Sequence, residues 1–126
     1  MSQARRALGA QGETQAASYL ESRGYRILAR NARSGGVELD IIASRRGTLV
    51  FVEVKTRRSR SMGAPVLAVD FRKRHRIVRG AAAWLRERGW RGQGVRFDVI
   101  GCEPDREGAW TITHIERAFD AGDARR

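Results

Sequence analysis

Short runs of apolar residues, many of them β-branched, follow one another closely in the first half of the chain. Residues 25–33, 37–44 and 48–57 form three such runs, separated by the turn signals Ser-Gly-Gly and Arg-Arg-Gly. They predict three strands, of which the last two form a hairpin. Two further runs, 95–102 and 109–115, predict two more short strands on either side of the turn Glu-Pro-Asp-Arg-Glu-Gly.

Two longer segments have the character of helices. Residues 2–23 are rich in alanine and free of proline, and Gly24 stands where a C-terminal cap is expected. A second helix is predicted over residues 66–88 and ends at Gly89, because apolar residues recur there at helical spacing. The order helix, three strands, helix, two strands predicts an α/β domain with a mixed β-sheet flanked by helices.

The length of 126 residues suits one domain, which we expect over residues 1–119, with an arginine-rich tail over residues 120–126. No run approaches the roughly 20 apolar residues that span a bilayer, and the N-terminus lacks the apolar run of a signal peptide. The one cysteine, Cys102, cannot form an internal disulfide and is expected to be a small core residue. These features favour a cytoplasmic protein with no membrane partner.

The chain has 25 lysine and arginine residues against 14 acidic ones, a formal net charge of +11. This excess favours a polyanionic partner, and either DNA or RNA would satisfy it. Basic residues cluster directly after the third predicted strand and early in the second predicted helix. The residues expected to contact a nucleic-acid backbone are Arg57, Arg58, Arg60, Arg72, Lys73, Arg74 and Arg76.

Ionisable residues interrupt the two most apolar strands, Val-Glu-Leu-Asp-Ile-Ile and Val-Phe-Val-Glu-Val-Lys. Because side chains alternate along a strand, Glu38 and Asp40 should share one face, and Glu53 and Lys55 one face of the neighbouring strand. The opposite faces would be wholly aliphatic: Val37, Leu39 and Ile41, and Val50, Val52 and Val54. Clustered buried carboxylates are costly unless a cation offsets them. We therefore expect Asp40 and Glu53 to bind Mg²⁺ or Mn²⁺.

Further groups are expected around this metal. Lys55 would hold or deprotonate an attacking water and stabilise charge on the phosphate. Glu13 shares a helical stripe with Ala16 and Leu20, and the small residues Gly9, Gly12 and Ala16 should let that stripe approach the sheet. Lys73 shares a stripe with Val69, Ile77 and Trp84, which would direct its amine towards a bound phosphate.

A structural role for these charges is the alternative. Glu-x-Lys alone usually marks a solvated ion pair, whereas an aspartate followed by Glu-x-Lys within aliphatic strands of a basic domain is a more specific pattern. Asp98 is expected to pair with an arginine, and His114 to be a hydrogen-bonded strand histidine. The rival function is a non-enzymatic protein that binds DNA or RNA, in which the acids form structural ion pairs or a degenerate nuclease site.

An ordered set of motifs resembles the YraN-like family of uncharacterised bacterial proteins, over roughly Leu8–Phe119. The set consists of GETQAASYLESRGYRILARNAR, ELDIIA, LVFVEVKTR, the helix containing Lys73, RFDVI and ITHIERAF. That family is distantly similar to archaeal Holliday-junction resolvases and, through them, to the restriction-endonuclease-like fold.

The resemblance implies a nuclease of the PD-(D/E)xK kind. It makes Asp40, Glu53 and Lys55 the catalytic and metal-binding signature, with Glu13 as the helical acid and Glu38 as an accessory acid. The implied activity is metal-dependent hydrolysis of phosphodiester bonds in DNA, including branched or junction DNA. A homodimer is expected by the same analogy, because two symmetric cuts in a junction require two sites.

Overall fold

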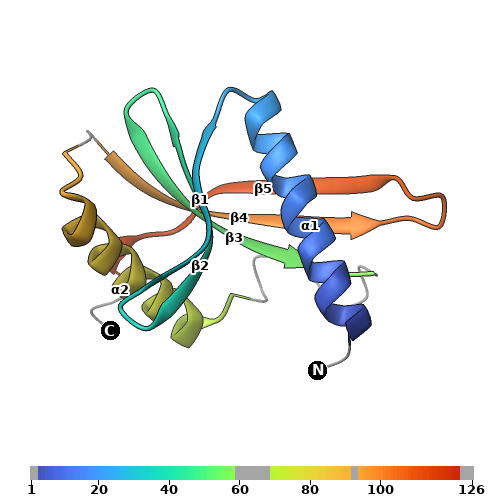
Figure 1. The fold of residues 1–126 in the computed structure, drawn as a ribbon, viewed down its shortest axis with the longest axis horizontal. Coiled ribbons are helices and arrows are strands. Elements are labelled where there is room, and N and C mark those ends of the chain that lie inside the picture. The colour runs from blue at the N-terminus through green and yellow to red at the C-terminus, as the bar shows by residue number, and fades with distance from the viewer. Residues whose placement is uncertain (1–2, 59–68, 92–93, 123–126) are drawn as a thin grey trace.

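The computed structural model describes residues 3–58, 69–91 and 94–122. The elements, shown in Figure 1, are α1 (Gln3–Ser22), β1 (Arg26–Ser34), β2 (Val37–Arg45), β3 (Thr48–Thr56), α2 (Phe71–Arg88), β4 (Gly94–Pro104) and β5 (Trp110–Phe119). The predicted order of helices and strands is confirmed. Arg60 and residues 66–68 lie outside the described part of the chain.

The five strands form one mixed sheet in the order β1-β2-β3-β4-β5. Strands β3 and β4 pair in parallel and every other neighbouring pair is antiparallel. A parallel pair requires a long crossover, and α2 lies within the one that joins β3 to β4. Between β1 and β2, Gly35 and Gly36 have φ values of 58° and 75°, as a two-residue hairpin loop with two left-handed positions requires.

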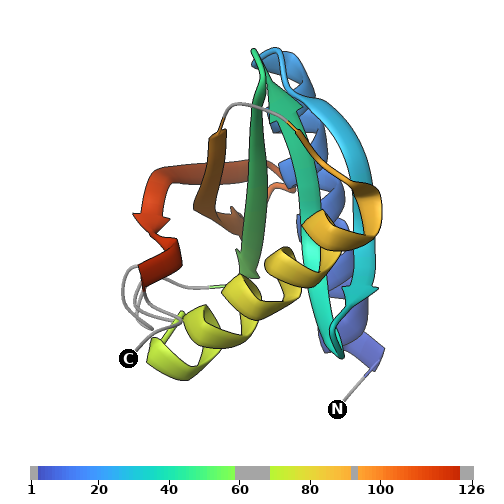
Figure 2. The ribbon, with the colours of Figure 1, turned by 90° about the vertical axis from the view of Figure 1, so that its left-hand side faces the viewer.

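The two helices cover opposite faces of the sheet, as Figures 1 and 2 show. Central strand β3 is buried from Leu49 to Val54 and contributes to both cores, so burial on its two faces holds the layers together. The α2-side core consists of Leu39, Ile42, Leu49, Phe51, Val69, Ile77, Val78, Ala81, Trp84, Phe97, Val99 and Phe119. The α1-side core consists of Ala16, Ala17, Leu20, Tyr25, Ile41, Ala43, Val50, Val52, Val54, Ile100 and Cys102.

Helix α2 begins at Phe71, so the predicted start at residue 66 is wrong. The Asp70 side chain accepts a hydrogen bond from the backbone N–H of Lys73 at 3.0 Å and caps the helix. Val69 precedes the cap and is buried in the core. At the other end Gly89 adopts a left-handed conformation with φ 61°, as predicted. No helix within the described residues is long and apolar enough to cross a bilayer.

Helix α1 approaches the sheet most closely at Gly12. A Cβ atom added there would lie 1.9 Å from Thr56 Oγ1, and the Gly12 carbonyl accepts a hydrogen bond from Cys102 Sγ at 3.4 Å. The expectation that small residues permit close packing therefore holds at Gly12, and Ala16 is fully buried. It is wrong for Gly9, where an added Cβ would meet nothing within 4 Å.

These two glycines provide a matched pair of substitutions. Gly12→Ala should destabilise the protein by about 1–3 kcal/mol, because the new methyl group collides with β3. Gly9→Ala should stabilise it by up to about 1 kcal/mol, because alanine is the better helix former and has open space. Thermal unfolding of both variants checks this. Equal shifts in melting temperature would contradict the close contact at Gly12.

Candidate active site

Strands β2 and β3 separate at Asp40. Their backbone pairing ends at Ile41, opposite Val52. Beyond that point the backbone N–H of Val54 donates to Asp40 Oδ2 at 2.9 Å, so a side-chain carboxylate replaces a strand carbonyl as acceptor. The alternation of β2 also breaks here, because Leu39 packs in the α2-side core and Ile41 in the α1-side core. The predicted single aliphatic face of this strand is therefore wrong, and Asp40 lies at the irregularity.

Glu53 projects from β3 towards α2, where it forms an ion pair with Lys73. The distance from Lys73 Nζ to Glu53 Oε1 is 3.0 Å, and the side chains are 30% and 8% exposed. Both residues line a small cavity of about 270 Å³ beside the β1–β2 turn. The amine that the sequence directs towards a phosphate thus contacts a predicted metal ligand, at the wall of an open cleft.

The carboxyl group of Asp40 is influenced by the charge of Glu53. Burial raises the pKa of Asp40 to about 8, and the negative charges of Glu53 and Glu13 add to the increase. The hydrogen bond from Val54 and the positive charge of Lys73 act in the opposite direction. The raised pKa of Asp40 beside a second carboxyl group marks a place where added positive charge is stabilising.

Two further predicted residues lie around these acids. Burial and the positive charge of Lys73 lower the pKa of the Lys55 ammonium, which favours a role in proton transfer. Burial raises the pKa of Glu13, against a side-chain hydrogen bond with Asn31. The negative charges of Glu38 and Glu53 raise the pKa of Glu13 further.

The cluster provides only part of a metal coordination shell. Within the described residues, no three histidine, cysteine, aspartate or glutamate side chains are arranged closely enough to hold a metal ion. The neighbouring pair Asp40 and Glu53 nevertheless suits Mg²⁺ or Mn²⁺, which commonly bind one or two protein carboxylates and complete their shell with water and phosphate.

The predicted arginine contacts are distributed over two sides of α2. Arg76 lines the cleft with Glu53 and Lys73, together with Arg33 from β1, which forms a 3.9 Å ion pair with the exposed Glu38. Arg74 faces the other side, where its Nε donates to the Val69 carbonyl at 2.9 Å and its guanidinium lies 5.8 Å from the centre of the Phe119 ring. Arg58 and Arg72 are exposed and Arg57 is half-buried.

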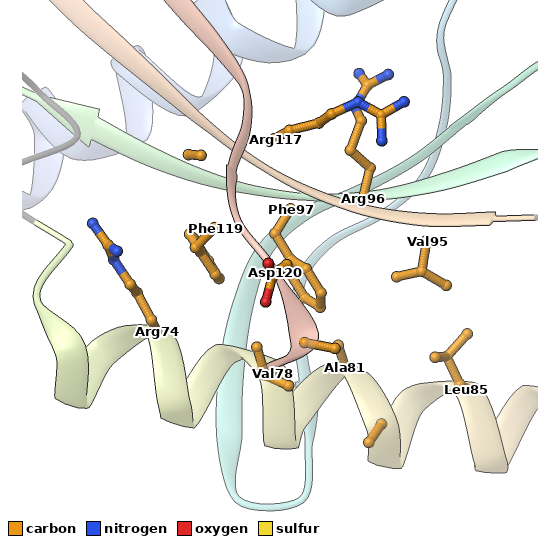
Figure 3. Close-up of a pocket in the computed structure, with 13 residues that line it drawn as sticks. Arg74, Val78, Ala81, Leu85, Val95, Arg96, Phe97, Arg117, Phe119 and Asp120 are labelled. Atoms are coloured by element: carbon orange, nitrogen blue, oxygen red, sulfur yellow. The ribbon is translucent and has the colours of Figure 1, made fainter. Parts of the chain in front are cut away.

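A larger groove of about 660 Å³ runs between α2 and strands β4 and β5 (Figure 3). Its walls are mainly apolar and include Val78, Leu85, Val95 and Phe119, with Arg74 at one end. None of the predicted acids or Lys55 lines it. The predicted residues Glu38, Glu53, Lys73 and Arg76 instead line the smaller cleft.

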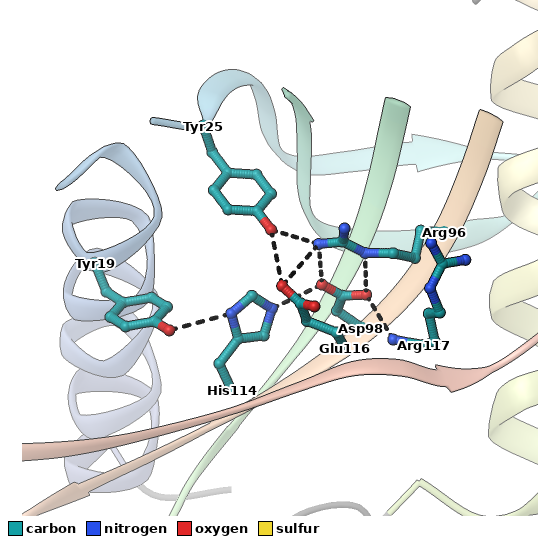
Figure 4. Close-up of polar contacts among 7 residues, drawn as sticks. All are labelled: Tyr19, Tyr25, Arg96, Asp98, His114, Glu116 and Arg117. Carbon is teal, nitrogen blue, oxygen red and sulfur yellow. Dashed lines mark hydrogen bonds and ion pairs between the residues drawn. The ribbon is translucent and has the colours of Figure 1, made fainter. Parts of the chain in front are cut away.

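A second buried charge network lies on the α1 side of the sheet (Figure 4). The fully buried Asp98 carboxylate accepts bonds from Arg96 at 2.8 and 2.9 Å, from His114 Nε2 at 2.7 Å and from the Arg117 backbone N–H at 3.1 Å. The hydroxyl of Tyr19 lies 3.2 Å from His114 Nδ1. Burial alone would raise the pKa of Asp98, but the hydrogen bonds from His114 and Arg96 lower it. The predicted arginine pairing of Asp98 and the hydrogen-bonded strand role of His114 are confirmed.

Two contributors to the site were not predicted from the sequence. Asn31 has φ 52° within β1 and hydrogen-bonds Glu13, and Arg33 lines the cleft. Asparagine tolerates left-handed backbone better than most residues, so an asparagine inside a predicted strand was the available signal. Cys102 is buried, and burial raises its pKa to about 12, which confirms the predicted core role.

Fold and site together define an α/β domain with a mixed five-stranded sheet and a cleft lined by Glu38, Glu53, Lys73 and two arginines. Residues 12–102 match the model of the uncharacterised protein family UPF0102. The chain is 46% identical over 120 residues to a UPF0102 protein of Nitratidesulfovibrio vulgaris (strain DP4), covering 95% of this chain and 89% of that protein. It is 50% identical over 121 residues to a UPF0102 protein of Trichlorobacter lovleyi, covering 90% and 91%. The chain therefore belongs to the UPF0102 family, and the resemblance to the YraN-like family is confirmed.

Because the pKa of Asp40 is raised, we expect this residue to make the free energy of unfolding depend on pH. A protonated Asp40 stabilises the fold fully below the ordinary carboxyl pKa, and this contribution is lost as pH rises towards about 8. Asp40→Asn keeps an acceptor for Val54 and stays neutral, so it should exceed wild type in stability by about 1–3 kcal/mol at pH 8 and by little at pH 4.

Thermal melts across this pH range in metal-free buffer measure the effect. Glu107→Gln, which removes an exposed charge in the β4–β5 turn, is the control and should not reproduce it. An Asp40→Asn variant less stable than wild type at pH 8 would show that the ionised carboxylate is structural.

Proposed function

We propose that this protein is a metal-dependent endonuclease with a restriction-endonuclease-like fold that hydrolyses phosphodiester bonds in DNA. The observation that carries the proposal is the electrostatic coupling of half-buried Asp40 to buried Glu53, which pairs with Lys73 at the wall of a cleft, in a domain with net charge +11. A buried acid pair is costly to maintain for structure alone. A divalent cation that is shared with a nucleic-acid phosphate would supply the positive charge that offsets these acids.

The residues of the chain divide the work between binding and proton transfer. Asp40 and Glu53 would hold the cation, and Mg²⁺ or Mn²⁺ bound there would polarise the phosphate and acidify an attacking water. Lys55 orients that water, accepts its proton or stabilises negative charge growing on the phosphate oxygens. Glu13 approaches from α1 and accepts a hydrogen bond from the same water.

Arginines at the rim hold the nucleic-acid backbone. Arg33 and Arg76 border the cleft from β1 and α2, and Arg58 and Arg72 are further exposed arginines. Such contacts to phosphate position a substrate without reading its sequence.

The second candidate function is a nucleic-acid-binding protein without catalysis, which the Lys73–Glu53 ion pair favours because it balances one acid without a metal. Glu53→Gln and Lys55→Arg discriminate between the two functions. In the enzyme, each should reduce Mg²⁺- or Mn²⁺-dependent cleavage by about a hundredfold or more, because a ligand or a short-range amine contact is lost. Both should retain DNA affinity.

The assay compares wild type and both variants on duplex DNA, branched DNA and RNA at matched salt, with melting temperature measured in parallel. Absence of metal-dependent cleavage by wild type on all three substrates, with binding intact, would favour the binding protein. Full cleavage by Lys55→Arg would exclude the specific amine role. Unfolding of either variant would assign its residue to structure.

The rim arginines give a prediction about salt. For binding by phosphate neutralisation, log K falls with log salt by about 0.9 per phosphate contacted on a B-form duplex. Arg33→Ala with Arg76→Ala should therefore reduce the slope by about 2 and weaken binding across all sequences.

The matched control removes two exposed arginines from the far end of α2 and the following turn, Arg86→Ala with Arg91→Ala. This pair should change the slope much less. If the slope of log K against log salt is the same for the two double variants, the nucleic-acid-binding surface lies away from the cleft.

A further inference from the structure

The Lys73–Glu53 ion pair occupies the position at which the proposed function requires a metal. Glu53 Oε1, which would face the cation, instead accepts a charge-assisted contact from Lys73 Nζ at 3.0 Å. The Glu53 side chain is 8% exposed, so it has little access to water as a substitute. A cation is needed there whether or not metal is present.

The two partners differ in how firmly they are held. Glu53 comes from buried central strand β3, whereas Lys73 comes from the first turn of α2 and its side chain is 30% exposed. The backbone of Lys73 is fixed by the Asp70 cap, but its flexible four-carbon stem is free to direct the ammonium elsewhere. The same cleft is bordered by Arg33 and Arg76, so a released ammonium stays among groups suited to phosphate.

We propose that Lys73 and a divalent cation are alternative counter-ions of Glu53. The bound metal displaces the ammonium, which then turns into the cleft to meet a substrate phosphate. Lys73 is thus a positioning residue that holds Glu53 in the metal-free protein and couples metal binding to phosphate binding. This inference rests on the proposed metal site.

Amine labelling tests the exchange without measuring activity. Lys55 and Lys73 are the only lysines in the chain. Mass spectrometry can therefore follow the acetylation of each lysine separately, in the peptide that contains it. Saturating Mg²⁺ should raise the acetylation rate of Lys73 severalfold relative to the N-terminal amine, because the ion pair is released. Glu53→Gln should raise that rate without metal and remove the response to Mg²⁺.

The outcomes separate this inference from the function on which it rests. If calorimetry shows that Mg²⁺ binds but the acetylation rate of Lys73 is unchanged or reduced, the exchange of counter-ions is wrong and the proposed metal site is still supported. Absence of Mg²⁺ or Mn²⁺ binding at millimolar concentration would overturn both. An increase that persists in Asp40→Asn, which lacks one ligand, would show that metal acts elsewhere.

Two variants distinguish displacement of the Lys73 ammonium by the metal from general repulsion between the metal and the positive charges of the cleft. Lys73→Met removes the competing ammonium and should tighten Mg²⁺ binding by about tenfold, the lower range for close charge pairs. Arg76→Met removes one positive charge from the same cleft without removing the ion pair, and should tighten it much less. If calorimetry gives equal changes in Mg²⁺ affinity for the two variants, Lys73 affects the metal only as one of several positive charges in the cleft.

Discussion

The charge balance around the Glu53 carboxylate is the interaction on which the rest of the site depends. Glu53 lies in the central strand of an apolar sheet and cannot leave it without breaking the core on both sides. Burial and the negative charge of Glu53 raise the pKa of Asp40, which Lys73 opposes, and burial together with the charge of Lys73 lowers the pKa of Lys55. Four ionisable groups therefore respond to one another, and any cation that enters the cleft changes all of them.

The fold holds this arrangement in place through two close packing contacts. Gly12 brings α1 against Thr56, which sets Glu13 beside the sheet, and Gly80 lets α2 approach Val37 at the opposite face. The parallel crossover from β3 to β4 carries α2, and with it Lys73, over the end of the strand that bears Glu53. The site is thus assembled where two helices meet one irregular strand.

Periodicity was sufficient to predict the elements and their order, because burial on a pleated sheet leaves a strong pattern. It could not predict the irregularity at Asp40, since that depends on a side chain replacing a backbone acceptor in a neighbouring strand. Nor could spacing alone reveal that Lys73 contacts Glu53 or that Arg33 borders the cleft, because both contacts join elements distant in sequence. The start of α2 was set too early because apolar Val69 continues the helical pattern into the residues before the Asp70 cap.

The proposed function depends on Asp40 and Glu53 holding one divalent metal between them. The most direct measurement is a crystal structure of the protein with Mn²⁺, in which anomalous scattering locates the metal independently of any assay. We expect an anomalous peak within coordination distance of both carboxylates, with the Lys73 amine moved away from Glu53. A fully occupied Lys73–Glu53 ion pair, with no peak at the two carboxylates in high Mn²⁺, would contradict it.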